Sequence, residues 1–384
     1  MDFASPPHHE MIRQAVRQFF AREWPRERLR QIDQDAVMPP ELREGMGKLG
    51  WFGMLVPPEY GGTGSPVQDV VVLIEEVARH FVSASGLFIL GSMAGRLLAR
   101  HGTEAQKRAM LPRLVSGQGM ISFGITEPSG GTDALALTTS ARRDGDEWVV
   151  NGQKVFTSMA HYAEHIIALA RTNHDVPKRA QGISLIAIPM NTPGVEVRKL
   201  QMLGWRSAGT NEVFFSDVRV PVTNLIGEQD RGFYHLLESL NNERITCAAI
   251  SVGIARAAFE DALAYAKERH AFGRPIGQFQ SIQHYLAEMA TDVDMARLLT
   301  QRAAWLQDND QPCHVESGMA KYATAEIAVR TCDKGMRILG GYGFTLEYDM
   351  QRYLRDSRLQ PFSPVSNEMV KNLIGESLGL PRSF

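Results

Sequence analysis

The chain has 384 residues, 44% hydrophobic and 22% charged, which is the composition of an ordinary globular protein. This length exceeds the usual size of one domain, so we expect two or three domains. A formal net charge of −2 gives no electrostatic reason to expect nucleic acid or an anionic membrane as partner. The sequence shows no cationic and apolar leader and no apolar run of membrane-spanning length, so we expect a cytoplasmic protein that does not bind membranes.

The first part of the chain, residues 1–120, has helical periodicity. Apolar residues recur at turn spacing from Ile12 to Phe20 and again from Val70 to Phe81. Asp69 precedes the second run and is predicted to cap that helix. We expect His8 and His9 to belong to a floppy terminus. The pattern predicts an N-terminal helical domain over 1–120.

The period changes near residue 120. Short apolar or alternating runs follow, among them 148–150, 166–170 and 183–188, and turns such as Asn151-Gly152 separate them. The runs are too closely spaced for helical crossovers, which argues against a dinucleotide-type parallel sheet. We therefore predict a middle antiparallel β-domain over 121–226.

Residues 227–384 are predicted to form a C-terminal helical bundle. Apolar stripes rich in small residues run from Ile245 to Ala262, from Ile282 to Ala296 and from Gly318 to Leu339. Small residues allow helices to pack closely. The fold class is therefore α+β, with helices on both sides of a β-domain in the sequence.

The three cysteines, Cys247, Cys313 and Cys332, are scattered through this last part of the chain. They lack the spacing of metal ligands, and no carboxylate or thiol is spaced to complete a site with the histidines near residues 161–174. We expect neither a metal site nor structural disulfides.

One turn stands out, over residues 123–133. It opens on a strand-like apolar run and turns through Pro128 and a glycine pair that ends at Gly131, with the hydroxyls of Thr126 and Thr132 on either side. A strand that enters such a turn can present several donors to a flat heterocycle or a phosphate. The alternative is an ordinary turn made by glycine and proline.

The stretch FGITEPSGGTD at 123–133 resembles the flavin-cradling signature of the acyl-CoA dehydrogenase family. The likeness continues in unbroken order over essentially the whole chain, through 59–64, 151–154, 269–273, 339–344 and Arg355-Asp356. The resemblance implies an acyl-CoA dehydrogenase-like fold with a C-terminal four-helix bundle, FAD as cofactor and a homotetramer. It also implies an acyl-CoA or acyl-carrier substrate and an electron-transferring flavoprotein as electron acceptor.

The resemblance implies two walls for the FAD site. Many relatives have Trp where this chain has Phe156 and Thr where it has Ser158, and both changes keep an aromatic face and a hydroxyl at the ring. The β-domain wall comprises Phe123, Ile125, Thr126, Gly131, Thr132, Phe156 and Ser158. The bundle wall, contributed partly by a neighbouring subunit, comprises Arg269, Phe272, Gln280, Arg337, Gly340, Gly341, Ser366 and Glu368. Substrate contacts fall on Thr132, Asn241 and Arg244.

The catalytic base is where this chain departs from many relatives. Flavin-dependent α,β-desaturation of a thioester needs a carboxylate to take the Cα proton. Many relatives supply a Glu from a loop after the Arg-Asp pair, where this chain has Pro364, which can take no proton and has no N–H.

A minority branch, including isovaleryl-CoA and long-chain enzymes, carries the base on a helix just before an arginine. Glu243 stands at that place, ahead of Arg244. We predict that Glu243 is the base and that burial raises its pKa towards the working pH. The alternative is that Glu243 only pairs with a neighbouring Arg at a helix start.

Three functions follow from the resemblance. The first is an FAD-dependent acyl-CoA dehydrogenase that uses Glu243. The second, favoured by Pro364, is other flavin chemistry, namely a monooxygenase, an enoyl-CoA reductase or a desulfinase. The third is a flavin- and acyl-CoA-binding protein without turnover.

Overall fold

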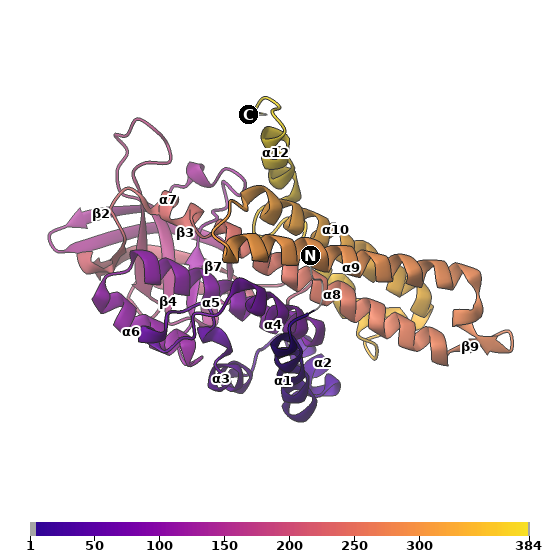
Figure 1. The fold of residues 1–384 in the computed structure, drawn as a ribbon. Helices are drawn as coiled ribbons and strands as arrows, with labels where there is room; N and C mark the ends of the chain where they lie inside the picture. The colour runs from indigo at the N-terminus through magenta and orange to yellow at the C-terminus, as the bar shows by residue number, and fades with distance from the viewer. Residues whose placement is uncertain (1–4, 383–384) are drawn as a thin grey trace.

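A computed structural model describes residues 5–382 and shows a sheet at one end of the molecule, formed by the middle of the chain, with helical segments before and after it in the sequence (Figure 1). The N-terminal helices are α1 (Pro7–Glu23), α2 (Arg26–Asp35), α3 (Pro40–Lys48), α4 (Val67–His80), α5 (Val82–His101) and α6 (Glu104–Val115). Within this described range α5 alone is long and apolar enough to cross a membrane, yet 83% of that segment is buried inside the protein. It is therefore placed as a core helix.

The start of the chain differs from the sequence prediction. His8 and His9 lie in the first turn of α1, and the side chain of His9 is buried, so they are not part of a floppy terminus. Asp69 does not cap α4, because the carboxylate of Asp308 accepts hydrogen bonds from the first backbone N–H groups of that helix. The side chain of Asp69 points to the two histidines instead.

The middle of the chain forms an eight-stranded sheet in the order β6-β7-β3-β2-β4-β5-β8, with β1 paired to β4. Most neighbours are antiparallel, as predicted, but β1 and β2 each run parallel to β4. The long segment between β1 and β4 contains the β2–β3 hairpin, which lets the chain return in the same direction. The strands are β1 (Ile121–Gly124), β2 (Ser140–Asp144), β3 (Glu147–Ser158), β4 (His165–Arg171), β5 (Ile183–Pro189), β6 (Val195–Leu200), β7 (Thr210–Pro221) and β8 (Leu225–Ile226).

The C-terminal bundle has three long helices, and two shorter ones pack against α10. Its helices are α7 (Gly232–Leu237), α8 (Leu240–Glu268), α9 (Gln280–Asp308), α10 (His314–Leu339), α11 (Met350–Ser357) and α12 (Asn367–Ser377). A small hairpin, β9 (His270–Ala271) with β10 (Arg274–Pro275), joins α8 to α9.

Close helix packing explains the small residues that the sequence places on α8. A Cβ added at Gly253 would lie 2.4 Å from the backbone oxygen of Glu75, so α8 can approach α4 this closely only with glycine there. Ala248, Ala249 and Ala255 are fully buried on the same helix. The packing fixes the start of α8, where Glu243 lies, against the N-terminal helices.

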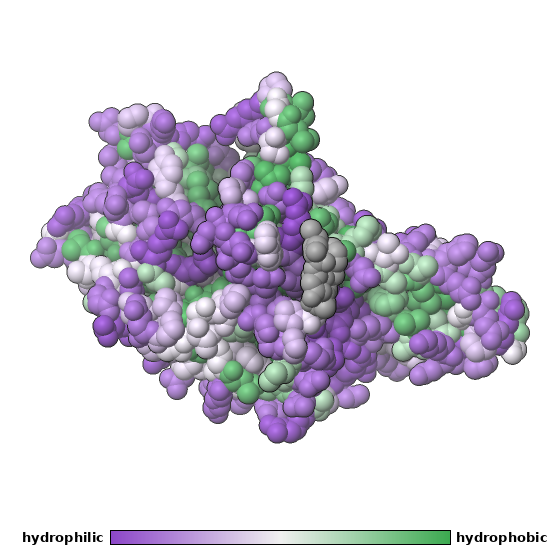
Figure 2. Space-filling model, in the orientation of Figure 1, coloured by the Kyte–Doolittle hydropathy of each residue, from purple (hydrophilic) through white to green (hydrophobic). Residues whose placement is uncertain are grey.

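The far end of the bundle leaves apolar groups in solvent. Figure 1 places the β9 hairpin at the opposite end of the molecule from the sheet. Apolar surface gathers along the bundle towards that end and on α12 (Figure 2). Phe272 on the hairpin is 96% exposed, and Phe344, in the loop after α10 beside the same end, is 81% exposed. This end of the chain therefore carries apolar side chains that the chain itself does not cover.

Candidate active site

The ends of β1 and β3 meet at the turn that the sequence singles out. The N–H of Val155 donates to the carbonyl of Thr126 at 2.9 Å, and the hydroxyl of Ser122 donates to the carbonyl of Ser158 at 2.6 Å. These bonds bring the predicted cofactor residues of β1 beside those of β3. Phe123 is buried, Ile125 and Thr126 are half-buried, and Phe156, Ser158, Gly131 and Thr132 are exposed.

Phe156 has an unusual backbone. Its φ of 55° is in the left-handed region, which a bulky residue rarely adopts, and its side chain is 62% exposed. The register between β3 and β7 shifts between Lys154 and Thr157, and such an irregularity re-aims the side chain beside it. A Cβ added at Gly131 would meet no atom within 4 Å, so the backbone of the turn is open as well. An exposed ring and an open glycine turn fit a flat aromatic cofactor.

A buried ion pair holds this turn in place. Lys154 Nζ lies 2.8 Å from a carboxylate oxygen of Glu127, and both side chains are almost fully buried. Thr138 and Thr139 also donate to the Glu127 carboxylate. Although burial opposes ionisation, the charge and hydrogen bond of Lys154, with the bonds from the threonines, lower the pKa of Glu127 to about 2. Glu127 is therefore ionised and structural.

Part of the predicted bundle wall, from Arg269 to the glycines after α10, lies at the far end of the molecule. Arg269 and Gly341 line a cavity of about 500 Å³ together with Tyr265 and Tyr342, and the Arg269 guanidinium lies 5.6 Å from the Tyr342 ring centroid. Cβ atoms added at Gly340 or Gly341 would meet nothing within 4 Å, so the backbone there can approach a ligand closely. A cation beside open glycine backbone fits a phosphate group.

The other residues predicted for this wall do not line the cavity at Arg269. Phe272 and Gln280 are exposed on the hairpin and at the start of α9. Arg337 is paired with Asp333 at 2.8 Å, and Ser366 caps α12 by accepting the N–H of Met369. Glu368 is exposed in the first turn of α12. Because the hairpin and the sheet lie at opposite ends of the molecule (Figure 1), one copy does not bring the hairpin part of this wall to the β-domain.

Glu243 lies in the first turn of α8 and is 5% exposed. Across residues 5–382, no group hydrogen-bonds or ion-pairs with its carboxylate. Arg244, the candidate partner, donates from Nη1 to Asn241 Oδ1 at 3.3 Å instead. Burial raises the pKa of Glu243 to about 7, against the smaller opposing effect of the Arg244 charge. Among the described residues, the structure therefore shows no ion pair between Glu243 and a neighbouring arginine.

Buried donors surround the start of α8. Within the described residues, Arg244 Nε and Asn242 Nδ2 are buried and have no hydrogen-bond partner. An unpaired buried donor is costly, so its presence beside an ionisable carboxyl is typical of a place that receives a polar ligand. Asn241 and Arg244, two of the predicted substrate contacts, are thus next to Glu243, whereas Thr132 is on the exposed turn after β1.

Sequence reasoning missed Lys321, a buried lysine on α10. Its Nζ lies 2.8 Å from Asn367 Oδ1 and 3.3 Å from the carbonyl of Pro361, so it ties down both ends of the loop that contains Pro364. Burial lowers the pKa of Lys321 to about 8. The position of a lysine within an alanine-rich apolar stripe could have indicated a buried lysine from the sequence.

This loop lies against α8, the helix that carries Glu243. The Glu243 charge adds to the effect of burial in raising the pKa of the Cys247 thiol, and the Lys321 charge opposes it. The hydroxyl of Ser251, one turn further along α8, donates to Gln360 Oε1 at 3.1 Å, so the start of this loop packs against α8. The loop that carries the base in many relatives is thus near Glu243, although its own position is occupied by Pro364.

Family models match the chain in three consecutive parts. They are described as acyl-CoA dehydrogenase N-terminal domain (residues 6–118), middle domain (122–218) and C-terminal domain (230–379). The chain therefore belongs to the acyl-CoA dehydrogenase family, whose members are flavin-dependent oxidoreductases that act on CH–CH groups and bind FAD.

Individual relatives are similar over nearly their whole length. The chain is 37% identical to a probable acyl-CoA dehydrogenase, YngJ, of Bacillus subtilis, covering 98% of this chain and 100% of that protein. It is 35% identical to the caffeyl-CoA reductase–Etf complex subunit CarC of Acetobacterium woodii, covering 91% and 93%. A glutaryl-CoA dehydrogenase of Mycobacterium smegmatis, solved in complex with FADH2, superposes with a TM-score of 0.93 at 26% identity, covering 99% and 96%.

Proposed function

We propose that this chain is an FAD-dependent acyl-CoA dehydrogenase that desaturates an acyl thioester between Cα and Cβ, with Glu243 as the base. One observation carries the proposal: Glu243 is a buried carboxyl with no partner among the described residues and a pKa near neutrality. A general base works best when its pKa is close to the operating pH.

We assign a separate role in the reaction to each residue of the site. Glu243 takes the Cα proton, and the unpaired donors Arg244 Nε and Asn242 Nδ2 bind polar parts of the substrate beside it. Phe156 and Ser158 provide an aromatic face and a hydroxyl on the β-domain side. When bound, FAD supplies the acceptor for the Cβ hydride. An electron-transferring flavoprotein would be the electron acceptor, and the abbreviation Etf stands in the name of the Acetobacterium relative.

The two cofactor walls favour a shared site. The β9 hairpin, which follows Arg269, lies at the opposite end of the molecule from β3, which carries Phe156 and Ser158 (Figure 1), and Gly341 lines the same cavity as Arg269. We propose that a second copy brings its hairpin to the β-domain of the first, in a homotetramer, which would also cover Phe272. A cytoplasmic location stays a prediction from the sequence.

A second function is favoured by the same pKa. With a pKa of about 7, Glu243 is protonated in a large fraction of molecules at neutral pH and can give a proton to Cα. That is the direction of an enoyl-CoA reductase, and a caffeyl-CoA reductase subunit is among the relatives. The same residues would then act in reverse, with reduced flavin as the hydride donor.

Flavin bleaching distinguishes these functions. The purified protein, loaded with FAD, is mixed without oxygen with a panel of saturated acyl-CoAs, and flavin absorbance is followed. Bleaching that is lost in Glu243→Gln supports the dehydrogenase. Glu238→Gln is the matched control, because Glu238 is a partly exposed acid near the same helix start and should leave bleaching unchanged.

The reverse experiment uses chemically reduced protein and a panel of enoyl-CoAs. Rapid reoxidation by an enoyl-CoA, with little bleaching by its saturated counterpart, would favour the reductase. If no thioester changes the flavin in either direction while FAD stays bound, both functions are wrong.

A further inference from the structure

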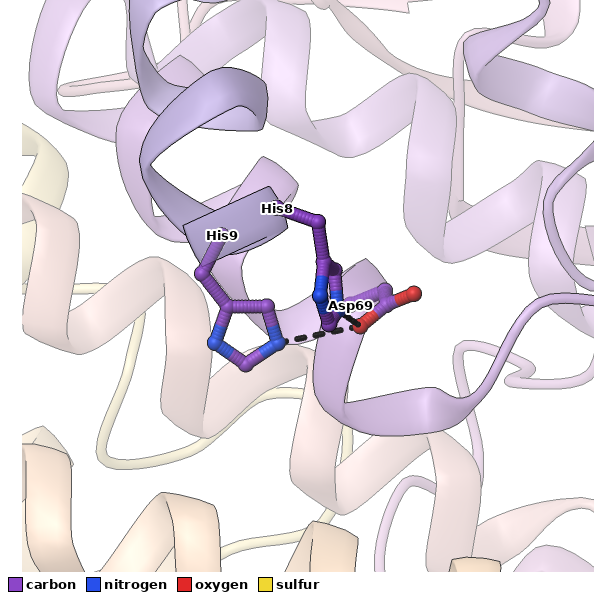
Figure 3. Close-up of side chains that lie close together, drawn as sticks. All are labelled: His8, His9 and Asp69. Carbon is purple, nitrogen blue, oxygen red and sulfur yellow. Dashed lines mark hydrogen bonds and ion pairs between the residues drawn. The ribbon is translucent and has the colours of Figure 1, made fainter. Parts of the chain in front are cut away.

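Three metal-ligand side chains converge at the junction of α1 and α4, far from Glu243 in the sequence. His8 and His9 begin α1, and Asp69 lies in the first turn of α4 (Figure 3). The Nε2 atoms of His8 and His9 lie 2.9 Å and 3.0 Å from the same oxygen, Oδ1 of Asp69. The three donor atoms all lie within 4.8 Å of one another.

The local needs of α4 do not explain this arrangement. An acid in the first turn normally serves the free N–H groups of its own helix. Here the Asp308 carboxylate already accepts from Val67 and Gln68, at 2.6 Å and 3.0 Å. Asp69 is therefore free to face α1, and within residues 5–382 no lysine or arginine pairs with it.

We propose that His8, His9 and Asp69 bind a divalent transition-metal ion, with Zn²⁺ as the best fit, and that this ion fastens α1 to α4. Two imidazole nitrogens and one carboxylate oxygen form a common zinc ligand set, and ligands about 2 Å from zinc lie about 3.3 Å apart in a tetrahedron. The observed spacing needs only small adjustments to reach that geometry. Because His8 is partly exposed, water can take the fourth position.

The surroundings permit such an ion. His9 is almost fully buried, and its second ring nitrogen, Nδ1, lies 3.4 Å from Ser5 Oγ, which can accept a hydrogen bond from Nδ1–H and so leave Nε2 free for a metal. The charge of Arg13 acts on His9, but this arginine is itself paired with Glu10 at 3.5 Å. The sequence predicted no metal because the ligands are sixty positions apart, a separation that only the packing of α1 on α4 closes.

A second cluster in the chain offers a control. His101, His235 and Glu238 also lie close together. However, His235 Nε2 already accepts the N–H of Glu228, and Glu238 is paired with Arg100 at 2.9 Å. The cavity that these three side chains line is also lined by Arg96 and Arg100, whose positive charges oppose the binding of a cation. We therefore assign the ion to the first cluster alone.

The test uses the full chain with its flavin. The protein is treated with a chelator, exchanged into metal-free buffer and titrated with ZnCl2 by calorimetry and with Co²⁺ by visible absorbance. We expect one ion per chain and visible absorption bands typical of four-coordinate Co²⁺. We also expect a higher midpoint of thermal unfolding with Zn²⁺, because an ion that binds only the folded state stabilises it. No binding, or binding without effect on the midpoint, would overturn the proposal.

Variants locate the ion. His8→Ala changes a partly exposed side chain and should fold normally, while Asp69→Asn keeps the shape of the acid; each should weaken Zn²⁺ binding by about 100-fold. His101→Ala is the matched control and should bind Zn²⁺ as the unchanged protein does. If His101→Ala removes the ion or the two ligand variants retain it, the assignment is wrong. None of these measurements depends on the flavin reaction.

Discussion

Two buried glutamates, Glu127 in the β-domain and Glu243 in the bundle, have nearly the same exposure and opposite chemistry. Glu127 receives hydrogen bonds from Lys154, Thr138 and Thr139, and its pKa falls to about 2. Glu243 receives none from the described residues, and its pKa rises to about 7. Burial alone favours the neutral acid in both places, so the partners decide the outcome.

The difference shows what each region needs. The turn after β1 needs a fixed shape, and a charged pair with further donors provides it. The start of α8 needs a group that changes its charge near neutral pH, and an unpartnered acid provides that. A buried acid is therefore a better candidate for proton transfer when its partners are missing than when they are present.

The largest expected effect comes from removing the unpartnered acid. Glu243→Gln should slow anaerobic flavin reduction by acyl-CoA by about 10²–10⁴-fold, the usual contribution of a general base. In the unchanged protein the same rate should rise with pH through about 7, because the base must be ionised. Single-turnover absorbance across pH checks both. A Gln variant with an undiminished rate would show that the base lies elsewhere.

Breaking the partnered acid should instead affect stability. Lys154→Met leaves Glu127 charged and buried beside an apolar group, and should reduce the free energy of unfolding by about 3–5 kcal/mol. Chemical denaturation measures it. The double change Lys154→Met with Glu127→Gln should recover a large part of the loss. If the double variant is no more stable than the single one, the charge of Glu127 is not the cause.

The unpartnered Glu243 should make the free energy of unfolding of the protein fall as pH rises towards 7. The folded pKa of Glu243, about 7, lies above its ordinary value of 4.5, so the unfolded chain loses the proton first as pH rises. The unchanged protein should therefore lose up to about 3 kcal/mol between pH 4.5 and 7 through this group, since each pKa unit corresponds to about 1.4 kcal/mol.

Glu243→Gln removes this dependence. The variant should be more stable than the unchanged protein at pH 8 and equal to it near pH 4.5, as followed by denaturant midpoints. Glu127 has the opposite sign, since its lowered pKa gives stability that is lost as pH falls from about 4.5 towards 2. Equal stability of Glu243→Gln and the unchanged protein at pH 8 would contradict the raised pKa.

The smallest effect concerns the loop beside Glu243. Lys321→Met removes the bonds to Asn367 and Pro361, and should cost about 1–3 kcal/mol for the polar groups left without a partner. Proteolysis of the 360–367 segment should become faster. Lys321→Arg, which keeps a donor, should be affected less. Unchanged proteolysis in Lys321→Met would show that the loop is held by other contacts.

The order of the domains and the family can be read from the amino-acid sequence. Periodicity separates the helical parts from the sheet, and the 123–133 turn with Arg269–Gly273 and 339–344 identifies the family, because local conformation and backbone access depend on nearby residue types. The sequence also points to Glu243, by its place before Arg244. The roles of the individual site residues stay predictions, with the geometry described above in their support.

The pairing of side chains, in contrast, depends on how the folded segments pack. Lys154 could be assigned to Glu127, 27 positions earlier, only once β3 was packed beside the turn after β1. The same holds for Lys321 on its loop and for Asp69 between His8 and His9. That Arg244 bonds Asn241 and not Glu243 follows from the directions of the side chains on α8. The physical reason is that a pKa or a ligand set depends on what lies within a few ångströms, and chain order does not fix those distances.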